Sequence, residues 1–506
     1  MTRAAGILLP IFSLPSPYGI GTLGHEAYKF ADFLAASGQT VWQVLPLGPT
    51  GCGDSPYQSF SSFAGNPYFI DIEMLIEDGL LTEEEADECD FGNEPRYIDY
   101  GKLYQNRFSL LEKAKERGLE RDSEKVSAFL IENNSWLPDY ALFMALKRHF
   151  GMKQWTEWED ADAKKHRSSA LKKYRSLLKD DIELFVYIQF LFFEQWNRLK
   201  NYVNGLGISI IGDIPIYAAL DSADCWADKN QFLLDADCRP VSVSGVPPDY
   251  FNAEGQLWGN PVYRWDRMKR NGFRWWMQRI EGAAKLYDII RIDHFRGLES
   301  YWAVPYGEKT AVNGQWLKGP GSAFIKKLRK TFPDIQFIAE DLGYLTPEVI
   351  KLVQYSGFPG MKVLEFAFDS DSENPYLPHN YNTDCVCYTG THDNPPAALW
   401  FEEIEEKTLA AAEKYLQLDE KEGYNWGLIR CGMDSPADLF IAQMQDYLNL
   451  GSGHRINTPG TDEGNWRWRM LDGETTIELA GRISEYTKAG GRKKAMPENS
   501  VGGSPE

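Results

Sequence analysis

The chain carries, at residues 287–294, the stretch Tyr-Asp-Ile-Ile-Arg-Ile-Asp-His, in which a short apolar run of β type ends in an aspartate. Glu340 directly follows a second such run, Ile335–Ala339, and Asp393 comes shortly after a third, Cys385–Tyr388. Carboxylates at the C-terminal ends of successive buried strands are how a (β/α)₈ barrel builds an active site. The three acids therefore predict a barrel whose mouth is lined by carboxylates.

The rest of the chain repeats the alternation of strand and helix that a parallel barrel requires. Helical periodicity is present in Glu26–Ala36, Ile182–Val203 and Phe273–Leu286. No Gly-rich dinucleotide fingerprint follows the first strand, which counts against an open Rossmann sheet. We therefore predict an α/β fold, a (β/α)₈ TIM barrel. The predicted strands are Ala5–Pro10, Val41–Leu47, Ile208–Ile211, Ile289–Ile292, Ile335–Ala339, Met361–Phe368, Cys385–Tyr388 and a segment within Ala437–Leu448, where periodicity also permits a helix.

The units of this barrel are unequal in length. About 160 residues separate the second and third predicted strands, far more than an ordinary βα loop. We predict one catalytic barrel domain over residues 1–487, with an inserted helical subdomain at about 72–180. A second insertion, at about 217–266, is rich in aromatic residues, Pro and Gly. Residues 488–506 have almost nothing to bury and are predicted to be a disordered tail.

Composition narrows the choice of partners. The net charge of -20 argues against nucleic acid or an anionic membrane surface as a partner. Seven scattered cysteines without CxxC spacing indicate reduced thiols, as in a cytosolic protein. The N-terminus lacks a secretion signal, and no apolar run reaches the roughly 18 residues of a membrane span. We expect a cytoplasmic protein, a monomer or homodimer, that binds neither nucleic acid nor membrane.

Asp293 is the first candidate for catalysis. Side chains alternate along a strand, so Arg291 and Asp293 face the barrel interior together while Ile290 and Ile292 face the helices. A neighbouring cation favours the ionised carboxylate, as a nucleophile attacking an anomeric carbon requires. The alternative is an ion pair that only fills the barrel. Because buried pairs stabilise poorly, we favour the catalytic interpretation.

Glu340 is the second candidate. It lies between apolar neighbours, Ile338 and Leu342, and removal from water raises the pKa of a carboxyl group. A raised pKa suits a general acid that later acts as a base. The alternative is an ordinary turn acid at a strand end, a role that Asp341 fits better. One ionised and one protonated carboxyl group are the equipment for cleaving a glycosidic bond through a covalent intermediate.

Asp393 is the third candidate, suited to hydrogen-bonding the sugar hydroxyl next to the anomeric carbon, with His392 as a further donor. His392 could instead cap a helix or loop. A metal site is another alternative, because His294, His392, Asp293 and Asp393 are ligand types. The first strand, Gly6–Pro10, lacks the His-x-His pair that metal hydrolases on this scaffold usually carry. We therefore predict no metal.

The motifs around these acids resemble those of amylomaltases, the 4-α-glucanotransferases or disproportionating enzymes of glycoside hydrolase family 77, related to the α-amylase clan. The resemblance runs in order from about Gly6 to Arg469. It rests on Arg-Ile-Asp-His-Phe-Arg-Gly (291–297), Ile-Ala-Glu-Asp-Leu-Gly (338–343), Gly-Thr-His-Asp-Asn (390–394), Gly-Asp-Ile-Pro-Ile-Tyr (212–217), Ser-Pro-Tyr-Gln-Ser-Phe-Ser-Ser-Phe-Ala-Gly-Asn-Pro-Tyr (55–68) and Asn-Thr-Pro-Gly-Thr (457–461).

That resemblance implies Asp293 as nucleophile, Glu340 as acid/base and Asp393 as stabiliser of the transition state. It also implies transfer of an α-1,4-glucan, such as a maltooligosaccharide or amylose, to the 4-hydroxyl of glucose or another glucan through a β-glucosyl-enzyme. Neither a metal nor an organic cofactor is implied. The substrate-binding residues implied in addition are Arg291, His392, Tyr57, Asp213 and Asn457.

A hydrolase would share the first half of this reaction, so the acceptor side decides between the two. Tyr250, Phe251 and Trp258 lie in a Gly-bearing loop of the second insertion, where aromatic rings suit stacking on sugars. Local packing of the loop is the alternative for each ring. We predict a retaining 4-α-glucanotransferase, possible alternatives being an α-1,4-glucan hydrolase, a non-catalytic glucan-binding barrel or a metal-dependent hydrolase.

Overall fold

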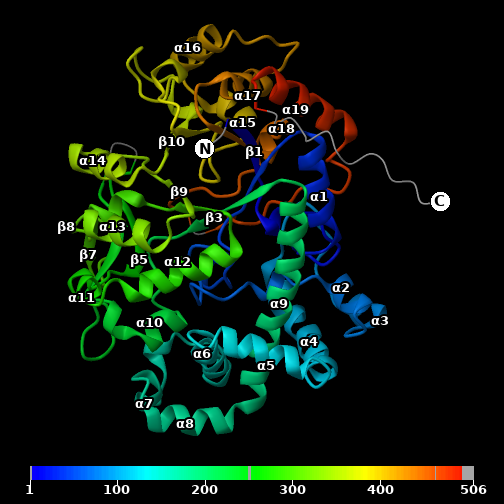
Figure 1. The fold of residues 1–506 in the computed structure, drawn as a ribbon, viewed down its shortest axis with the longest axis vertical. Coiled ribbons are helices and arrows are strands. Elements are labelled where there is room, and N and C mark those ends of the chain that lie inside the picture. The colour runs from blue at the N-terminus through cyan, green and yellow to red at the C-terminus, as the bar shows by residue number, and fades with distance from the viewer. Residues whose placement is uncertain (1–2, 249–251, 462, 493–506) are drawn as a thin grey trace.

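The computed structural model describes residues 3–248, 252–461 and 463–492, and its centre is a parallel sheet of eight strands (Figure 1). The strand order is β10-β11-β12-β1-β2-β3-β6-β9, with every neighbouring pair parallel. The strands are β1 (Ala4–Leu8), β2 (Val41–Gln43), β3 (Ser209–Ile214), β6 (Ile289–Ile292), β9 (Gln336–Ala339), β10 (Gly360–Val363), β11 (Cys385–Tyr388) and β12 (Leu439–Gln443).

The two outer strands of this order, β9 and β10, meet and nearly close the barrel. The backbone N–H of Ala339 donates to the carbonyl of Pro359 at 2.9 Å. The Asp341 carboxylate accepts from the N–H of Met361 at 2.7 Å. Asp341 therefore ties β9 to β10, which confirms a structural role for this acid. The predicted TIM barrel is confirmed.

Several strands end earlier than predicted. β2 stops at Gln43 rather than Leu47, and β10 stops at Val363, where a 3₁₀ turn over Leu364–Phe366 follows. The segment Ala437–Leu448 contains both elements that its periodicity permits. It forms β12 and then the short helix α18 (Met444–Tyr447). Apolar runs continue past the barrel strands because the first residues of each loop are also buried.

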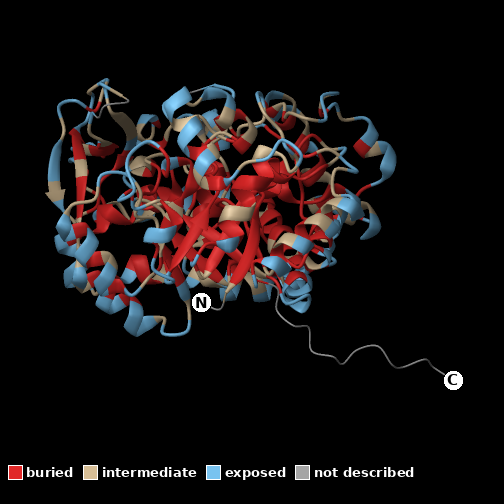
Figure 2. Ribbon diagram, turned by 90° about the horizontal axis from the view of Figure 1, so that it is seen from above, coloured by how far each residue is buried: buried red, intermediate tan, exposed pale blue. Residues whose placement is uncertain are grey.

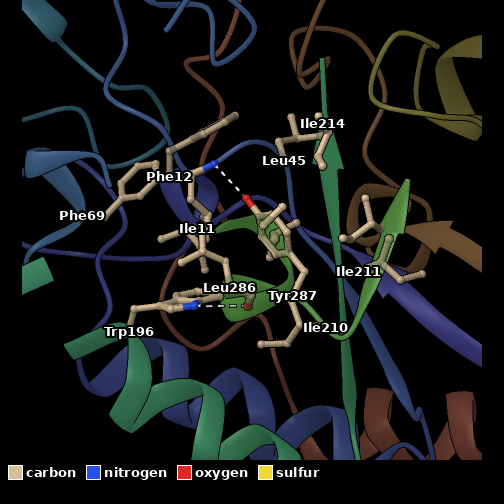
Figure 3. Packing of buried hydrophobic residues seen from close by; sticks show 14 of the residues in the cluster. Ile11, Phe12, Leu45, Phe69, Trp196, Ile210, Ile211, Ile214, Leu286 and Tyr287 are labelled. Atoms are coloured by element: carbon tan, nitrogen blue, oxygen red, sulfur yellow. Dashed lines mark hydrogen bonds between the residues drawn. The ribbon is translucent and has the colours of Figure 1, made fainter. Parts of the chain in front are cut away.

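Helices surround the barrel, so that buried residues gather in the central strands and exposed residues in the outer helices (Figure 2). In Figure 3, Trp196 of α9 donates through its indole N–H to the carbonyl of Leu286 in α12, at 3.2 Å. Thr346 is the N-cap of α14, and its side chain accepts from the N–H of Val349. These helices are α1 (His25–Ala36), α9 (Lys179–Gly205), α11 (Trp265–Arg270), α12 (Arg274–Leu286), α13 (Ser322–Thr331), α14 (Pro347–Ser356), α15 (Ala397–Glu403), α16 (Glu406–Leu416), α17 (Tyr424–Asp434) and α19 (Ile477–Ala489).

The long segment between β2 and β3 is helical. Its helices α4 to α8, drawn in blue to green in Figure 1, lie together on one side of the molecule. The 27-residue helix α9 leads from this segment back to the barrel. The remaining helices of the segment are α2 (Ile72–Glu77), α3 (Glu83–Asp87), α4 (Tyr100–Gly118), α5 (Ser123–Glu132), α6 (Leu137–His149), α7 (Ala161–Lys164) and α8 (Ser168–Leu177).

The aromatic-rich insertion does not end at the predicted boundary near residue 266. After α10 (Ala223–Ala227) it forms β4 (Ser242–Val246) and β5 (Gln256–Pro261), which pair antiparallel. β4 also pairs with β7 (Ser300–Pro305), and β7 with β8 (Gln315–Lys318), both of which follow β6 in the chain. The resulting sheet, β5-β4-β7-β8, joins two segments that the sequence analysis treats separately.

The predicted start of the disordered tail, at residue 488, is too early in the sequence. α19 continues through Ala489, and Arg492 is fully buried. The Arg492 guanidinium donates to the carbonyls of Met433 at 2.7 Å and Ala4 at 2.9 Å. These bonds to the end of α17 and the start of β1 hold residues 488–492 in place, an effect that composition alone does not predict. Residues 493–506 lie outside the described residues.

No helix in the described part of the chain is long and apolar enough to cross a membrane.

Candidate active site

Arg291 joins two acids at the carboxyl end of the barrel. Its guanidinium contacts the Asp213 carboxylate at 2.5 Å and the Asp293 carboxylate at 3.2 Å. The register of β3 against β6 places Asp213 opposite Arg291, so strand pairing itself brings the first ion pair together. Arg291 and Asp213 are buried, whereas the Asp293 side chain keeps 27% exposure. Of the three groups, Asp293 is the one that a substrate can reach.

Tyr57 and His392 extend this contact across the barrel mouth. The Tyr57 hydroxyl donates to Asp213 at 2.7 Å and lies 2.9 Å from the His392 Nε2. The two rings are stacked, with centroids 5.3 Å apart. His392 Nε2 in turn lies 3.4 Å from the Asp393 carboxylate.

Asp393 is held from a second direction by the loop after β12. The Asn457 amide donates to the Asp393 carboxylate at 2.6 Å, and Arg455 donates to the Asp393 carbonyl at 2.9 Å. A continuous chain of contacts therefore joins six side chains from five separate parts of the sequence. We call this group the polar network; its members are Tyr57, Asp213, Arg291, His392, Asp393 and Asn457.

Asp446, which the sequence analysis missed, fastens the loop that carries His392 and Asp393. One carboxylate oxygen accepts from the Thr389 hydroxyl at 2.5 Å, and the other accepts from the N–H of Ala397 at 2.7 Å. Both ends of the loop are therefore bound to one fully buried carboxyl group. Its position, in the first turn after the eighth strand, follows the same pattern of an acid after a buried strand that marks Asp293 and Glu340.

Glu340 is held by backbone rather than by side chains. Its two carboxylate oxygens accept from the N–H groups of His294 at 2.7 Å and Leu342 at 2.9 Å. His294 adopts a left-handed backbone conformation, φ 47°, at the turn that follows Asp293. The His294 ring meets Trp258 edge-on, with centroids 4.8 Å apart. We call Glu340, His294 and Trp258 the Glu340 wall.

The protonation of Asp293 and Glu340 is coupled. Burial raises the pKa of Asp293 well above its usual value; Arg291 opposes this, and the carboxylates of Asp213, Glu340 and Asp393 add to it. Burial also raises the pKa of Glu340, against the lowering effect of Arg291 and the two backbone N–H groups. The sequence predicts that Arg291 keeps Asp293 ionised. In the structure, Arg291 alone does not set the charge of Asp293, because burial and the neighbouring carboxylates act against it. The two groups titrate as a pair.

Burial favours the neutral form of the two histidines near these acids. Burial lowers the pKa of His392, although Asp393 pulls in the opposite direction. Burial and the positive charge of Arg296 lower the pKa of His294 to about 3. Neutral imidazoles donate or accept single hydrogen bonds without adding charge to the site.

A small cavity of about 60 Å³ lies behind the polar network, between β3 and α12. Tyr57 and Asp213 belong to its lining, as do Arg279 and Tyr287. The second Asp213 oxygen, Oδ1, has no hydrogen-bond partner among the described residues. The cavity offers room for one or two water molecules and is too small for a sugar ring.

The residues implied by the resemblance fall into two groups at the carboxyl end of the barrel. Tyr57, Asp213, Arg291, His392, Asp393 and Asn457 form the polar network, and Glu340 and Trp258 lie on the Glu340 wall. Tyr250 and Phe251 lie outside the described residues. Residues 3–248, 252–461 and 463–492 contain no group of three or more His, Cys, Asp or Glu side chains placed to hold a metal ion.

Comparisons with known proteins agree with this geometry. A family model described as 4-alpha-glucanotransferase matches residues 9–475. A 4-alpha-glucanotransferase from Clostridium butyricum is 50% identical, over 95% of this chain and 99% of its own. One from Thermus thermophilus is 46% identical, over 97% of this chain and 99% of its own.

Solved structures show the same fold. An amylomaltase from Streptococcus agalactiae, in complex with acarbose, superposes with a TM-score of 0.95 at 40% identity and covers 97% of this chain and 100% of its own. An amylomaltase from Corynebacterium glutamicum gives 0.75 at 19% identity, covering 96% of this chain and 75% of its own, which bears on the fold alone. With the matching family model and near full-length relatives at up to 50% identity, the chain belongs to the 4-alpha-glucanotransferase family.

Proposed function

We propose that this protein transfers α-1,4-glucans by a double displacement at the barrel mouth. The Asp293 carboxylate attacks the anomeric carbon of the donor while Glu340 gives its proton to the departing glycosidic oxygen. The resulting β-glycosyl ester on Asp293 is then attacked by the 4-hydroxyl of an acceptor, whose proton returns to Glu340. Two inversions leave the product in the α configuration.

The division of roles follows from the contacts of the two acids. Asp293 lies 3.2 Å from the Arg291 guanidinium, whereas Glu340 forms no ion pair among the described residues. Where two carboxyl groups share one proton, the member beside the cation is the one that ionises. We therefore assign the shared proton to Glu340.

The polar network is assigned to the sugar that undergoes reaction. Asp393 and His392 face the same mouth as Asp293, and Asn457 and Tyr57 hold them there. Hydrogen bonds to the hydroxyl beside the anomeric carbon strengthen as the ring flattens toward the transition state. All steps use groups of the chain itself, so the proposal includes neither a metal nor an organic cofactor.

The Glu340 wall is assigned to the acceptor. Glu340 must touch the departing oxygen, so the departing glucan and the incoming acceptor lie on its side of the donor sugar. Trp258, beside His294, offers an aromatic surface there. Glucose or a maltooligosaccharide would serve as acceptor, and the far end of the same chain would give a cyclic product. We propose a monomer or homodimer that acts in the cytoplasm.

One observation carries the proposal: two acids from adjacent parallel strands, β6 and β9, share a mouth, and only one of them touches a cation. Incubation with maltotriose tests it. Transfer gives glucose together with a ladder of longer oligosaccharides, whereas an α-glucan hydrolase gives only shorter sugars. A non-catalytic glucan-binding barrel leaves maltotriose unchanged. Addition of EDTA should not alter the ladder, and its loss would favour a metal-dependent reaction.

A further inference from the structure

Two exposed aromatic residues lie in β8 and in the loop that follows β9. Trp316, in β8, is 41% exposed, and Tyr344, in the loop after β9, is 78% exposed. In Figure 1, β7 and β8 lie at the edge of the molecule close to α13 and α14. Single exposed aromatic residues are ordinary, but two of them bound to one cation near a catalytic acid call for an explanation.

Arg296 joins the two aromatic residues. Its guanidinium lies over the Trp316 ring, 4.0 Å from the centroid, and donates to the Tyr344 carbonyl at 3.1 Å. Arg296 itself is buried. Trp316 also contacts Trp302, its partner across the β7–β8 ladder, with centroids 5.2 Å apart. Cation, ring and neighbouring strand therefore hold the exposed indole in one orientation.

Two of these residues lie close along the chain to Asp293 and Glu340. Arg296 follows Asp293 by three residues, and Tyr344 follows Glu340 by four. The N–H of Phe295, next to Arg296, donates to the Glu340 carbonyl at 3.1 Å. Since Glu340 must lie between the donor sugar and the departing chain, the loop after Glu340 borders the path of that chain. We name Arg296, Trp316 and Tyr344 the aromatic shelf.

We propose that the aromatic shelf is a binding site for the more distant sugar units of a long α-glucan on the acceptor side. This rests on the proposed function, because it takes Glu340 as the acid that faces the departing chain. An aromatic face binds the apolar C–H face of a glucose ring, and a fixed indole loses little freedom on binding. Glu299, whose charge acts on Arg296, pairs with Lys318 at 2.6 Å, which suits an uncharged ligand.

The test compares donors of different length. In Trp316→Ala, the ratio of kcat/KM for maltoheptaose to that for maltotriose should fall about 10-fold, because only the longer chain reaches the shelf. Trp316→Phe, which keeps an aromatic face, should retain most of the ratio. The matched control is Tyr306→Ala, which removes a 49% exposed ring just after β7 that does not stack on Arg296. Its ratio should equal that of the unaltered protein.

Binding gives an independent measurement. In a Glu340→Gln background, which keeps the donor intact, calorimetric titration with maltoheptaose should show about 10-fold weaker affinity after Trp316→Ala. If Trp316→Ala leaves the kcat/KM ratio, the affinity and the unfolding midpoint unchanged, the aromatic shelf is not a glucan-binding site. The proposed function would still be supported in that case if maltotriose gives a ladder of longer products. If Trp316→Ala converts a dimer to a monomer without changing the kcat/KM ratio, the proposal is also wrong. The shelf would then be a contact with a second copy of the chain rather than a glucan-binding site.

Discussion

The polar network and the Glu340 wall both lie at the carboxyl end of the barrel, yet they are built in opposite ways. In the polar network, side chains position side chains: Tyr57, Asp213, Arg291 and His392 are linked by contacts of 2.5 to 2.9 Å. On the Glu340 wall, the catalytic acid is held by two backbone N–H groups and the rest is aromatic. The difference matches the task of each side, since the reacting sugar needs one geometry whereas acceptors vary in length.

The largest effect is expected where the two sides meet, at Asp293. Asp293→Asn removes the nucleophile but keeps its shape, and disproportionation of maltotriose should fall by about 10⁴-fold or more. Quantification of glucose and of longer products measures the loss. The unfolding midpoint should not decrease, because the variant relieves repulsion between Asp293 and the nearby acids Asp213, Glu340 and Asp393. Substantial remaining transfer in a pure preparation would reject Asp293 as nucleophile.

The next effect concerns the support of the polar network by Asp446. Burial raises the pKa of Asp446 to about 6, and hydrogen bonds from Ala397 and Thr389 only partly oppose this. In the unfolded chain its pKa is about 4. Between these values the folded protein holds a proton that the unfolded chain has lost. The stabilising contribution of Asp446 is therefore complete below about pH 4 and is lost as pH rises through about 6.

Asp446→Asn removes this dependence. From pH 4 to pH 7, the free energy of unfolding of the unaltered protein should decrease relative to that of the variant by about 3 kcal/mol. Urea unfolding at four or five pH values measures the difference. A gap between the two proteins that is constant over this range would show that Asp446 does not titrate as described.

A smaller effect is expected from a single hydroxyl of the polar network. Tyr57→Phe removes the donor to the Asp213 carboxylate and the contact with His392. A hydrogen bond to a charged group is worth about 1.5–3 kcal/mol, so kcat/KM for maltotriose should fall roughly 10- to 100-fold.

The control for this prediction is Tyr388→Phe. The Tyr388 hydroxyl donates to Gln43 at 2.9 Å inside the barrel, outside the polar network. Its loss should lower the unfolding midpoint and change kcat/KM by about 2-fold or less. If both variants lose activity equally, the network is no more than part of the barrel core.

The smallest effect is expected on the Glu340 wall. Trp258→Ala should lower transfer to an acceptor by about 10-fold and hydrolysis by less, because only transfer needs a bound acceptor. The ratio of longer oligosaccharides to total reducing sugar measures this directly. Equal losses in both reactions would remove Trp258 from the acceptor side and leave the two walls functionally alike.

The sequence predicts best those features that depend on a single segment of the chain, such as one strand, one helix or one motif. The eight strands and most barrel helices follow from apolar periodicity, and the motifs around Asp293, Glu340 and Asp393 indicate the mouth. Pairings between distant segments are not predicted. The ladder of β4 with β7, the bonds of Arg492 to Met433 and the attachment of the Asp393 loop to Asp446 depend on the folded chain alone. The same limit explains the expectation that Arg291 alone would keep Asp293 ionised, because the sequence does not show that the carboxylates of Asp213, Glu340 and Asp393 lie close enough to raise its pKa.

Trapping of the covalent intermediate tests the central claim most directly. Glu340→Gln should still react with α-maltotriosyl fluoride, whose leaving group needs no acid, but should resolve the ester slowly for lack of a base. Intact-protein mass spectrometry is expected to show one added maltotriosyl group, and peptide mapping is expected to place it on Asp293. Turnover of the fluoride without an adduct, or an adduct on another residue, would contradict a nucleophilic Asp293 opposite a proton-donating Glu340.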